Sequence, residues 1–151
     1  MEQERRTVIK ELNALLRSCE IGVSGYDKYA RDAAEPVLKG KFDHYKSEYA
    51  ENAKSIAERI TALGGSPKYG TGMAGIVSDV TYAVRGQDGR EAPELLRTAH
   101  YGETKNIDAT ERVLSAPGLD EESRDVLRRQ HRSARARQEE LIDLIRDFDL
   151  G

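Results

Sequence analysis

Two polar side chains interrupt the apolar heptad positions of the C-terminal half of the chain. Glu103 lies in a helical segment at about 92–115, and His131 lies in the next one, at about 120–148. If these segments fold back on each other about a turn near residue 118, Glu103 is level with residue 133, less than one helical turn from His131. Carboxylates and imidazoles that project inward from facing helices are the ligands of di-iron and di-manganese sites in helix bundles. The sequence therefore predicts that Glu103 and His131 meet inside a bundle, where they could bind iron, manganese or zinc.

A complete dinuclear site also needs a Glu-x-x-His pair on each of two helices. The residues three positions before the three histidines are Lys41, Arg97 and Arg128, so the pair is absent. Two interpretations remain, a single or degenerate metal site and a metal-free layer of buried hydrogen bonds. Asn52 and Gln138 occupy heptad positions too and would complete that layer, because buried polar groups are normally hydrogen-bonded. We favour the metal-free layer and expect no cofactor.

Three other features could carry chemistry. Cys19 lies on an apolar seam, which favours a small buried residue over a reactive thiol. The segment 70–75 matches G-x-G-x-x-G, but a helix precedes it where a dinucleotide site needs a strand, so we expect a loop. The segment 120–148 carries a basic face that could meet an acidic partner, although flanking acids favour a solvated, salt-bridged face. The residues of this face are Arg124, Arg128, Arg129, Arg132, Arg135 and Arg137.

The positions of apolar residues predict the elements that carry these side chains. Apolar residues recur at alternating spacings of three and four, which is typical of helices packed along a seam. We expect helices at about 6–34, 36–63, 92–115 and 120–148. In the first, the seam is Val8, Leu12, Leu15, Cys19, Gly22, Tyr26, Tyr29 and Ala33. In the last, it is Leu127, His131, Ala134, Gln138, Leu141, Ile145 and Phe148.

The breaks between these helices predict the topology. Pro36, Gly64-Gly65 and Pro117-Gly118 end or begin helices, because proline and glycine disfavour their continuation. The short connections make two antiparallel hairpins. A long crossover, with a short amphipathic helix at about 73–85, joins the hairpins as in ferritin-like bundles. We expect one all-α, ferritin-like four-helix-bundle domain over residues 1–151.

Composition narrows the classes of function. The 151 residues carry 24 Lys and Arg against 27 Asp and Glu, a net charge of −3, so nucleic-acid binding is not expected. No apolar run approaches the ~18 residues of a membrane span. The first six residues lack the apolar stretch of a signal peptide, so we expect a cytoplasmic protein.

Three short motifs resemble those of a known family. The stretches 19–26 (CEIGVSGY), 63–67 (LGGSP) and 101–103 (YGE) are similar to those of an uncharacterised bacterial four-helix-bundle family. That family carries a domain-of-unknown-function label within the ferritin-like superfamily, and the resemblance extends from about Thr7 to Phe148. It implies a ferritin-like fold and no established activity or cofactor. Glu103 matches the family's glutamate in the third helix. Ile21 and Val23 stand where members often have Asp and Glu, which argues against metal binding by the first helix.

Three functions are compatible with these observations. We favour a non-enzymatic structural, stress-related or assembly protein. The second is a metal-dependent oxidase or iron-handling protein that uses Glu103 and His131 at a degenerate site. The third is a binding module that uses the arginine face of 120–148. A homo-oligomer or a protein partner is expected, and a nucleic acid or a membrane is not.

Overall fold

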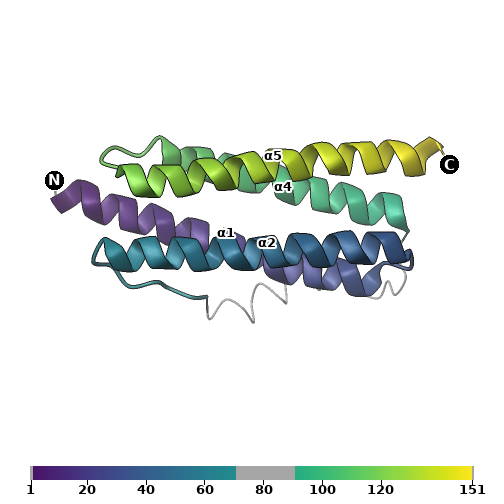
Figure 1. Cartoon of the computed structure of the whole chain (residues 1–151), viewed down its shortest axis with the longest axis horizontal. Helices are drawn as coiled ribbons and strands as arrows, with labels where there is room; N and C mark the ends of the chain where they lie inside the picture. The colour runs from purple at the N-terminus through teal and green to yellow at the C-terminus, as the bar shows by residue number, and fades with distance from the viewer. Residues whose placement is uncertain (1, 71–90, 151) are drawn as a thin grey trace.

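Figure 1 shows the computed structural model of the chain, which describes residues 2–70 and 91–150. The regular secondary structure in these residues consists of four helices and no strand. The helices are α1 (Glu2–Asp32), α2 (Pro36–Ala62), α4 (Ala92–Leu114) and α5 (Glu121–Leu150). The all-α class is therefore confirmed. The short helix expected at about 73–85 lies outside the described residues.

The helix ends follow the local signals in the sequence. Proline occupies the first turn of α2, where its missing N–H costs no hydrogen bond. After α2, Gly64 has a φ of +88° and Gly65 donates its N–H to the Ile60 carbonyl at 2.9 Å. This is the usual glycine-based stop of a helix. Gly118, with a φ of +81°, makes the turn between α4 and α5.

Asp120 begins α5 and joins it to α2. Its Oδ2 accepts the Ser123 N–H at 3.1 Å and pairs with Arg59 of α2 at 3.0 Å. Burial opposes ionisation of the Asp120 carboxyl, but the hydrogen bonds from Ser123 and the charge of Arg59 lower its pKa. The cap therefore both starts a helix and holds the two hairpins together at this end.

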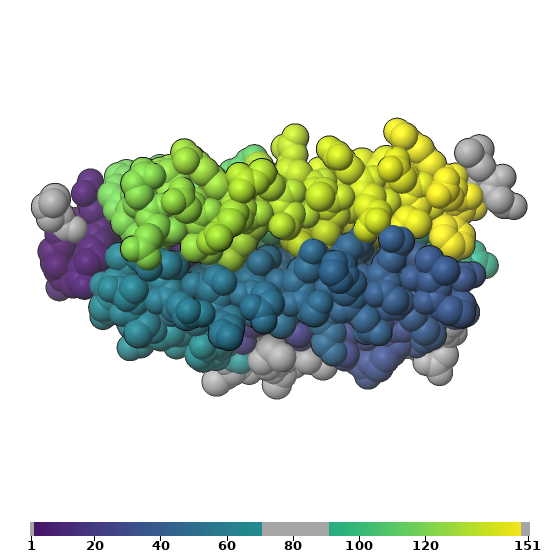
Figure 2. Space-filling model, in the orientation of Figure 1, coloured from purple at the N-terminus to yellow at the C-terminus, as the bar shows by residue number. Residues whose placement is uncertain are grey.

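The four helices lie side by side along the long axis of the molecule (Figure 1). α1 and α5 run from the end marked N, whereas α2 and α4 run the opposite way. Each helix is therefore antiparallel to both of its packing partners, with α1 against α2 and α4, and α5 against α4 and α2. Figure 2 shows the face formed by α2 and α5. None of the helices described is both long and apolar enough to cross a membrane.

The predicted seam of α1 agrees with the core, because six of its eight residues are buried. The seam of α5 was assigned wrongly at two positions. His131 and Gln138 are half-buried, and Gln130 and Arg137 are buried in their place. In a heptad pattern, an apolar residue can be followed at a spacing of three or of four. The prediction took the residues four positions after Leu127 and Ala134, whereas the residues three positions after them are buried. The buried residues of α5 are Ser123, Leu127, Gln130, Ala134, Arg137 and Leu141.

Candidate functional site

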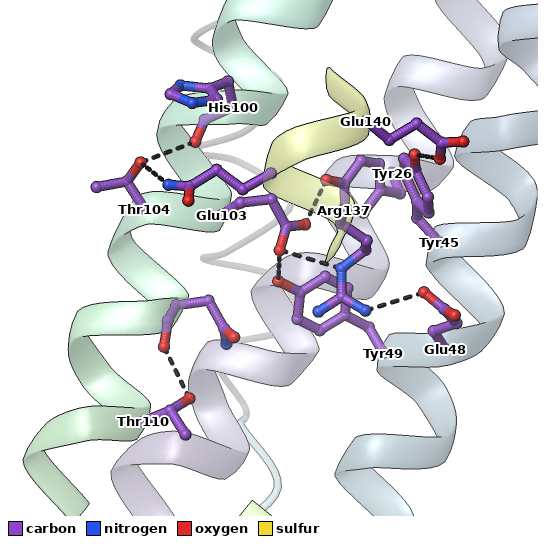
Figure 3. A network of polar contacts seen from close by, with 12 residues as sticks. Tyr26, Tyr45, Glu48, Tyr49, His100, Glu103, Thr104, Thr110, Arg137 and Glu140 are labelled. Atoms are coloured by element: carbon purple, nitrogen blue, oxygen red, sulfur yellow. Dashed lines mark hydrogen bonds and ion pairs between the residues drawn. The ribbon is translucent and has the colours of Figure 1, made fainter. Parts of the chain in front are cut away.

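A buried carboxylate, Glu103 of α4, joins all four helices (Figure 3). Glu103 is 1% exposed to solvent. Oε2 accepts a hydrogen bond from the Tyr26 hydroxyl of α1 at 2.5 Å. Oε1 accepts from the Tyr49 hydroxyl of α2 at 2.9 Å and from Nε of Arg137 on α5 at 3.0 Å. We refer to Glu103, Tyr26, Tyr49, Arg137 and Glu48 as the Glu103 cluster.

Arg137 is the cation of the Glu103 cluster, and its side chain is 2% exposed. Besides Glu103 it pairs with Glu48 of α2, through Nη1 at 2.9 Å. Its guanidinium carbon lies 4.4 Å from the ring centroid of Tyr49, a cation–π contact. Nη2 has no hydrogen-bond partner in the described part of the chain. One guanidinium therefore lies between two carboxylates and over an aromatic ring.

Burial and charge fix the protonation of these side chains. Burial, followed by the negative charge of Glu103, raises the pKa of Tyr26 and of Tyr49 well above the usual value, so both phenols remain hydrogen-bond donors. Burial opposes the charge of Arg137, but Tyr49, Glu103 and Glu48 outweigh it and raise the pKa of the guanidinium. The guanidinium is therefore a cation, and the two phenols are neutral.

A glycine in α1 makes room for the cluster. A Cβ at Gly22 would lie 2.7–2.9 Å from three ring carbons of Tyr49, closer than side-chain atoms approach each other. The absence of a side chain thus lets the Tyr49 ring lie against the backbone of α1. Gly22 was predicted as a seam residue, and this contact gives its structural role.

The cluster reaches the surface between α2 and α5. Glu48, 35% exposed, also lies 3.4 Å from Nε2 of His44. Both line a cavity of about 550 Å³ between α2 and α5, together with Glu140. Glu140 accepts a hydrogen bond from the Tyr45 hydroxyl and pairs with Lys41 at 2.9 Å. A third phenol–carboxylate contact, between Tyr45 and Glu140, therefore lies beside the two that Glu103 makes.

The structure does not bring the predicted residues together as one layer. His131 binds Glu111 at 2.9 Å, and its side chain is 23% exposed, so it shares no partner with Glu103. Gln138 donates to Thr104 at 3.1 Å. Asn52 contributes its backbone carbonyl, which accepts from the Gln130 amide at 3.4 Å. The expected approach of Glu103 and His131 is wrong, whereas the burial and hydrogen bonding of Glu103 agree with the prediction.

The partners of Glu103 in the structure were not predicted from the sequence. Tyr26 was assigned to the seam of the first helix, but as a packing residue. Arg137 was assigned to a basic outer face, because a charged residue rarely occupies a core position unless it is paired. A signal was present, since Arg137 follows Leu127 and Ala134 at heptad spacing and Leu141 follows Arg137.

A family model supplies the relationship of this chain to other proteins. The model described as "Domain of unknown function (DUF2383)" matches residues 7–116. The chain belongs to this family. A comparison with curated protein sequences gives no match. The match is in keeping with the resemblance of the motifs at 19–26, 63–67 and 101–103.

Solved structures with the same architecture are ferritin-like proteins. A dodecameric thioferritin, the bacterioferritin-related protein of Bacteroides fragilis, is 20% identical with a TM-score of 0.78, over 96% of this chain and 88% of that one. A mutant of Dps1 from Mycobacterium smegmatis is 18% identical, with a TM-score of 0.80 over 96% and 99% of the two chains. A Dps protein from Vibrio cholerae O1 is 15% identical, with a TM-score of 0.76 over 95% and 91%. These similarities establish the ferritin-like fold.

The Vibrio cholerae protein is described as a member of a superfamily of ferritin-like diiron-carboxylate proteins, which raises the question of whether metal fits here. In the described residues, no three side chains of His, Cys, Asp or Glu are grouped to hold a metal ion. The carboxylates of Glu103 and Glu48 are bridged by the positive charge of Arg137. A metal cation next to this guanidinium would be repelled in a medium of low dielectric constant. The donor set therefore does not fit a dinuclear metal centre.

Proposed function

We propose that this protein is a non-enzymatic ferritin-like bundle with a structural, stress-related or assembly role, stabilised by an internal ion pair in place of a metal centre. The observation that supports this function is the position of Arg137 between Glu103 and Glu48. Buried charges are tolerated when they are paired and hydrogen-bonded, and each oxygen of Glu103 has a donor. The cation is thus supplied by the chain itself.

Elemental analysis of protein purified without chelator or affinity tag tests this proposal. We expect no stoichiometric iron, manganese or zinc in the native protein or in Glu103→Leu. The alternative function, a metal-dependent oxidase or iron-handling protein that uses Glu103 and His131, requires bound metal that is lost in Glu103→Leu. His131→Leu is the matched variant, because it removes a predicted ligand outside the Glu103 cluster. Stoichiometric metal that both variants lose would replace our proposal with the alternative.

The assembly role includes self-association. The Bacteroides fragilis protein of the same fold is dodecameric. Among the described residues, four large apolar or aromatic side chains are exposed, namely Ile21, Val37, Tyr69 and Tyr101. We expect a homo-oligomer, which sedimentation velocity over a range of protein concentrations detects. A species with the mass of one 16.9 kDa chain at every concentration would contradict self-association.

A second candidate function is a binding module that uses α5. Four of its arginines are exposed and have no ion pair in the described residues, namely Arg128, Arg129, Arg132 and Arg135. This differs from the salt-bridged face that the flanking acids suggested, and it favours an acidic partner. Retention on a poly-glutamate column that weakens as salt is added would support this function. The retention should be weaker for an Arg128→Gln/Arg132→Gln variant and unchanged for Arg146→Gln, which is the control. Equal retention of all three proteins would exclude it.

A further inference from the structure

An aromatic cluster from α1 and α2 surrounds the Tyr26 phenol of the Glu103 cluster. The ring centroid of Tyr26 lies 5.7 Å from Tyr29, 5.8 Å from Phe42, 5.3 Å from Tyr45 and 5.8 Å from Tyr49. These are distances of rings in direct contact. Tyr26 is buried, whereas Tyr29 is half-buried. An electron can therefore leave the buried phenol through an adjacent ring without entry of the oxidant into the core.

The Tyr26 phenol also has a base in place for its proton. Its hydroxyl donates to Oε2 of Glu103 at 2.5 Å, at the short end of charge-assisted hydrogen bonds. Removal of an electron from a phenol makes its O–H strongly acidic, so a carboxylate at this distance takes the proton as the electron leaves. In the described residues Oε2 accepts only from Tyr26, because the other two donors bind Oε1. Oε2 therefore has a lone pair available for that proton.

The other two phenols with carboxylate partners are less suited to this reaction. The Tyr49 ring lies under the positive guanidinium of Arg137, at 4.4 Å, which opposes the loss of an electron from that ring. Its hydroxyl shares Oε1 of Glu103 with Arg137. Tyr45 donates to Glu140, whose side chain is 44% exposed, so water competes for that carboxylate. Tyr26 alone in this group combines burial, ring contacts and an oxygen that it does not share.

From this geometry we propose that Tyr26 is a redox-active tyrosine, which gives one electron to a one-electron oxidising radical while its phenolic proton passes to Oε2 of Glu103. The O–H bond of Tyr26 breaks, and a new O–H bond forms on Glu103. The oxidant gains the electron. The products are a neutral tyrosyl radical and a neutral carboxylic acid, which donates a hydrogen bond back to the radical oxygen. Burial shields this radical from a second tyrosyl radical, with which an exposed one would couple.

The test begins from a parent variant in which Tyr69, Tyr82 and Tyr101 are replaced by Phe. A photogenerated ruthenium(III) polypyridyl complex serves as the one-electron oxidant, and the sample is frozen for electron paramagnetic resonance. We expect a neutral tyrosyl signal that is lost on addition of Tyr26→Phe and kept on addition of Tyr49→Phe. The second change is the matched control, because it removes the other phenol bound to Glu103.

High-field spectra separate a redox role from mere packing. The g-values of a tyrosyl radical report a hydrogen bond to its oxygen, and we expect that signature in the parent variant. Glu103→Gln, in a folded protein as judged by circular dichroism, should lower the radical yield because the amide does not accept the proton. A signal that survives Tyr26→Phe, a loss with Tyr49→Phe alone, or no trapped radical in the folded parent would each overturn the proposal.

Discussion

Replacement of Arg137 by Met tests whether the ion pair at the centre of the bundle stabilises it. The variant keeps a long apolar stem but removes the cation, so Glu103 keeps only the phenols of Tyr26 and Tyr49 as donors. Breaking a buried pair by the loss of one partner typically costs about 3–5 kcal/mol, since an uncompensated charge remains. The ion pair is almost completely buried, since the side chain of Arg137 is 2% exposed and that of Glu103 is 1% exposed. We expect Arg137→Met to lower the free energy of unfolding by about 3–5 kcal/mol.

Urea denaturation followed by circular dichroism measures this loss. Arg146→Met is the matched control on the same helix, because Arg146 is 72% exposed and pairs with Asp143 at 3.8 Å. An exposed pair of this kind contributes about 0–1 kcal/mol. Glu103→Leu should cost about as much as Arg137→Met, because it leaves the guanidinium with Glu48 alone. The double variant removes both charges, so its loss should be smaller than the sum of the two single losses by about 2 kcal/mol or more.

Two results would refute this reasoning. A loss for Arg137→Met within about 1 kcal/mol of that for Arg146→Met would mean that water solvates the guanidinium in the native protein. Additive losses in the double variant would mean that Glu103 and Arg137 do not interact with each other.

Three further predictions follow from particular contacts. Gly22→Ala should destabilise the protein by about 1–3 kcal/mol, because the new methyl overlaps the Tyr49 ring. Gly102→Ala should stabilise it by about 0.5–1 kcal/mol, because its methyl would meet no atom within 4 Å apart from the neighbouring residues and backbone of its own helix. Thermal unfolding compares the two, and shifts of the same sign would contradict the packing around Gly22. The pKa of Asp120 in the native protein lies below the usual value of 3.8. The ionised carboxyl therefore adds to the free energy of unfolding above pH 3.8, and this stabilisation is lost as the pH falls through the native pKa. Asp120→Asn should therefore be less stable than the native protein by about 0.5–1 kcal/mol at neutral pH and about equal in acid, whereas a pH-independent difference would disprove the linkage. Burial raises the pKa of Cys19 to about 12, so iodoacetamide should modify it in urea and not in the native protein, and rapid native alkylation would show an accessible thiolate.

The sequence alone determined the secondary structure and much of the packing. The helix breaks at Pro36, Gly64 and Gly118 are local, because they depend on the backbone preferences of proline and glycine. The seam of α1 was recognised because its apolar residues leave little choice of face. The burial of Glu103 was also predictable, since its helix places apolar residues one and two turns away on the same face. These features depend on residues within one helix.

The tertiary structure decided which side chains meet. In α5, His131 and Gln130 are both compatible with heptad spacing, and so are Gln138 and Arg137. Periodicity weights each residue by its own hydrophobicity, and by that measure Arg137 belongs outside. It lies inside because Glu103 and Glu48, from two other helices, compensate its charge. The free energy of burying an arginine depends on partners 34 and 89 residues away, and the spacing within a single helix carries no information about them.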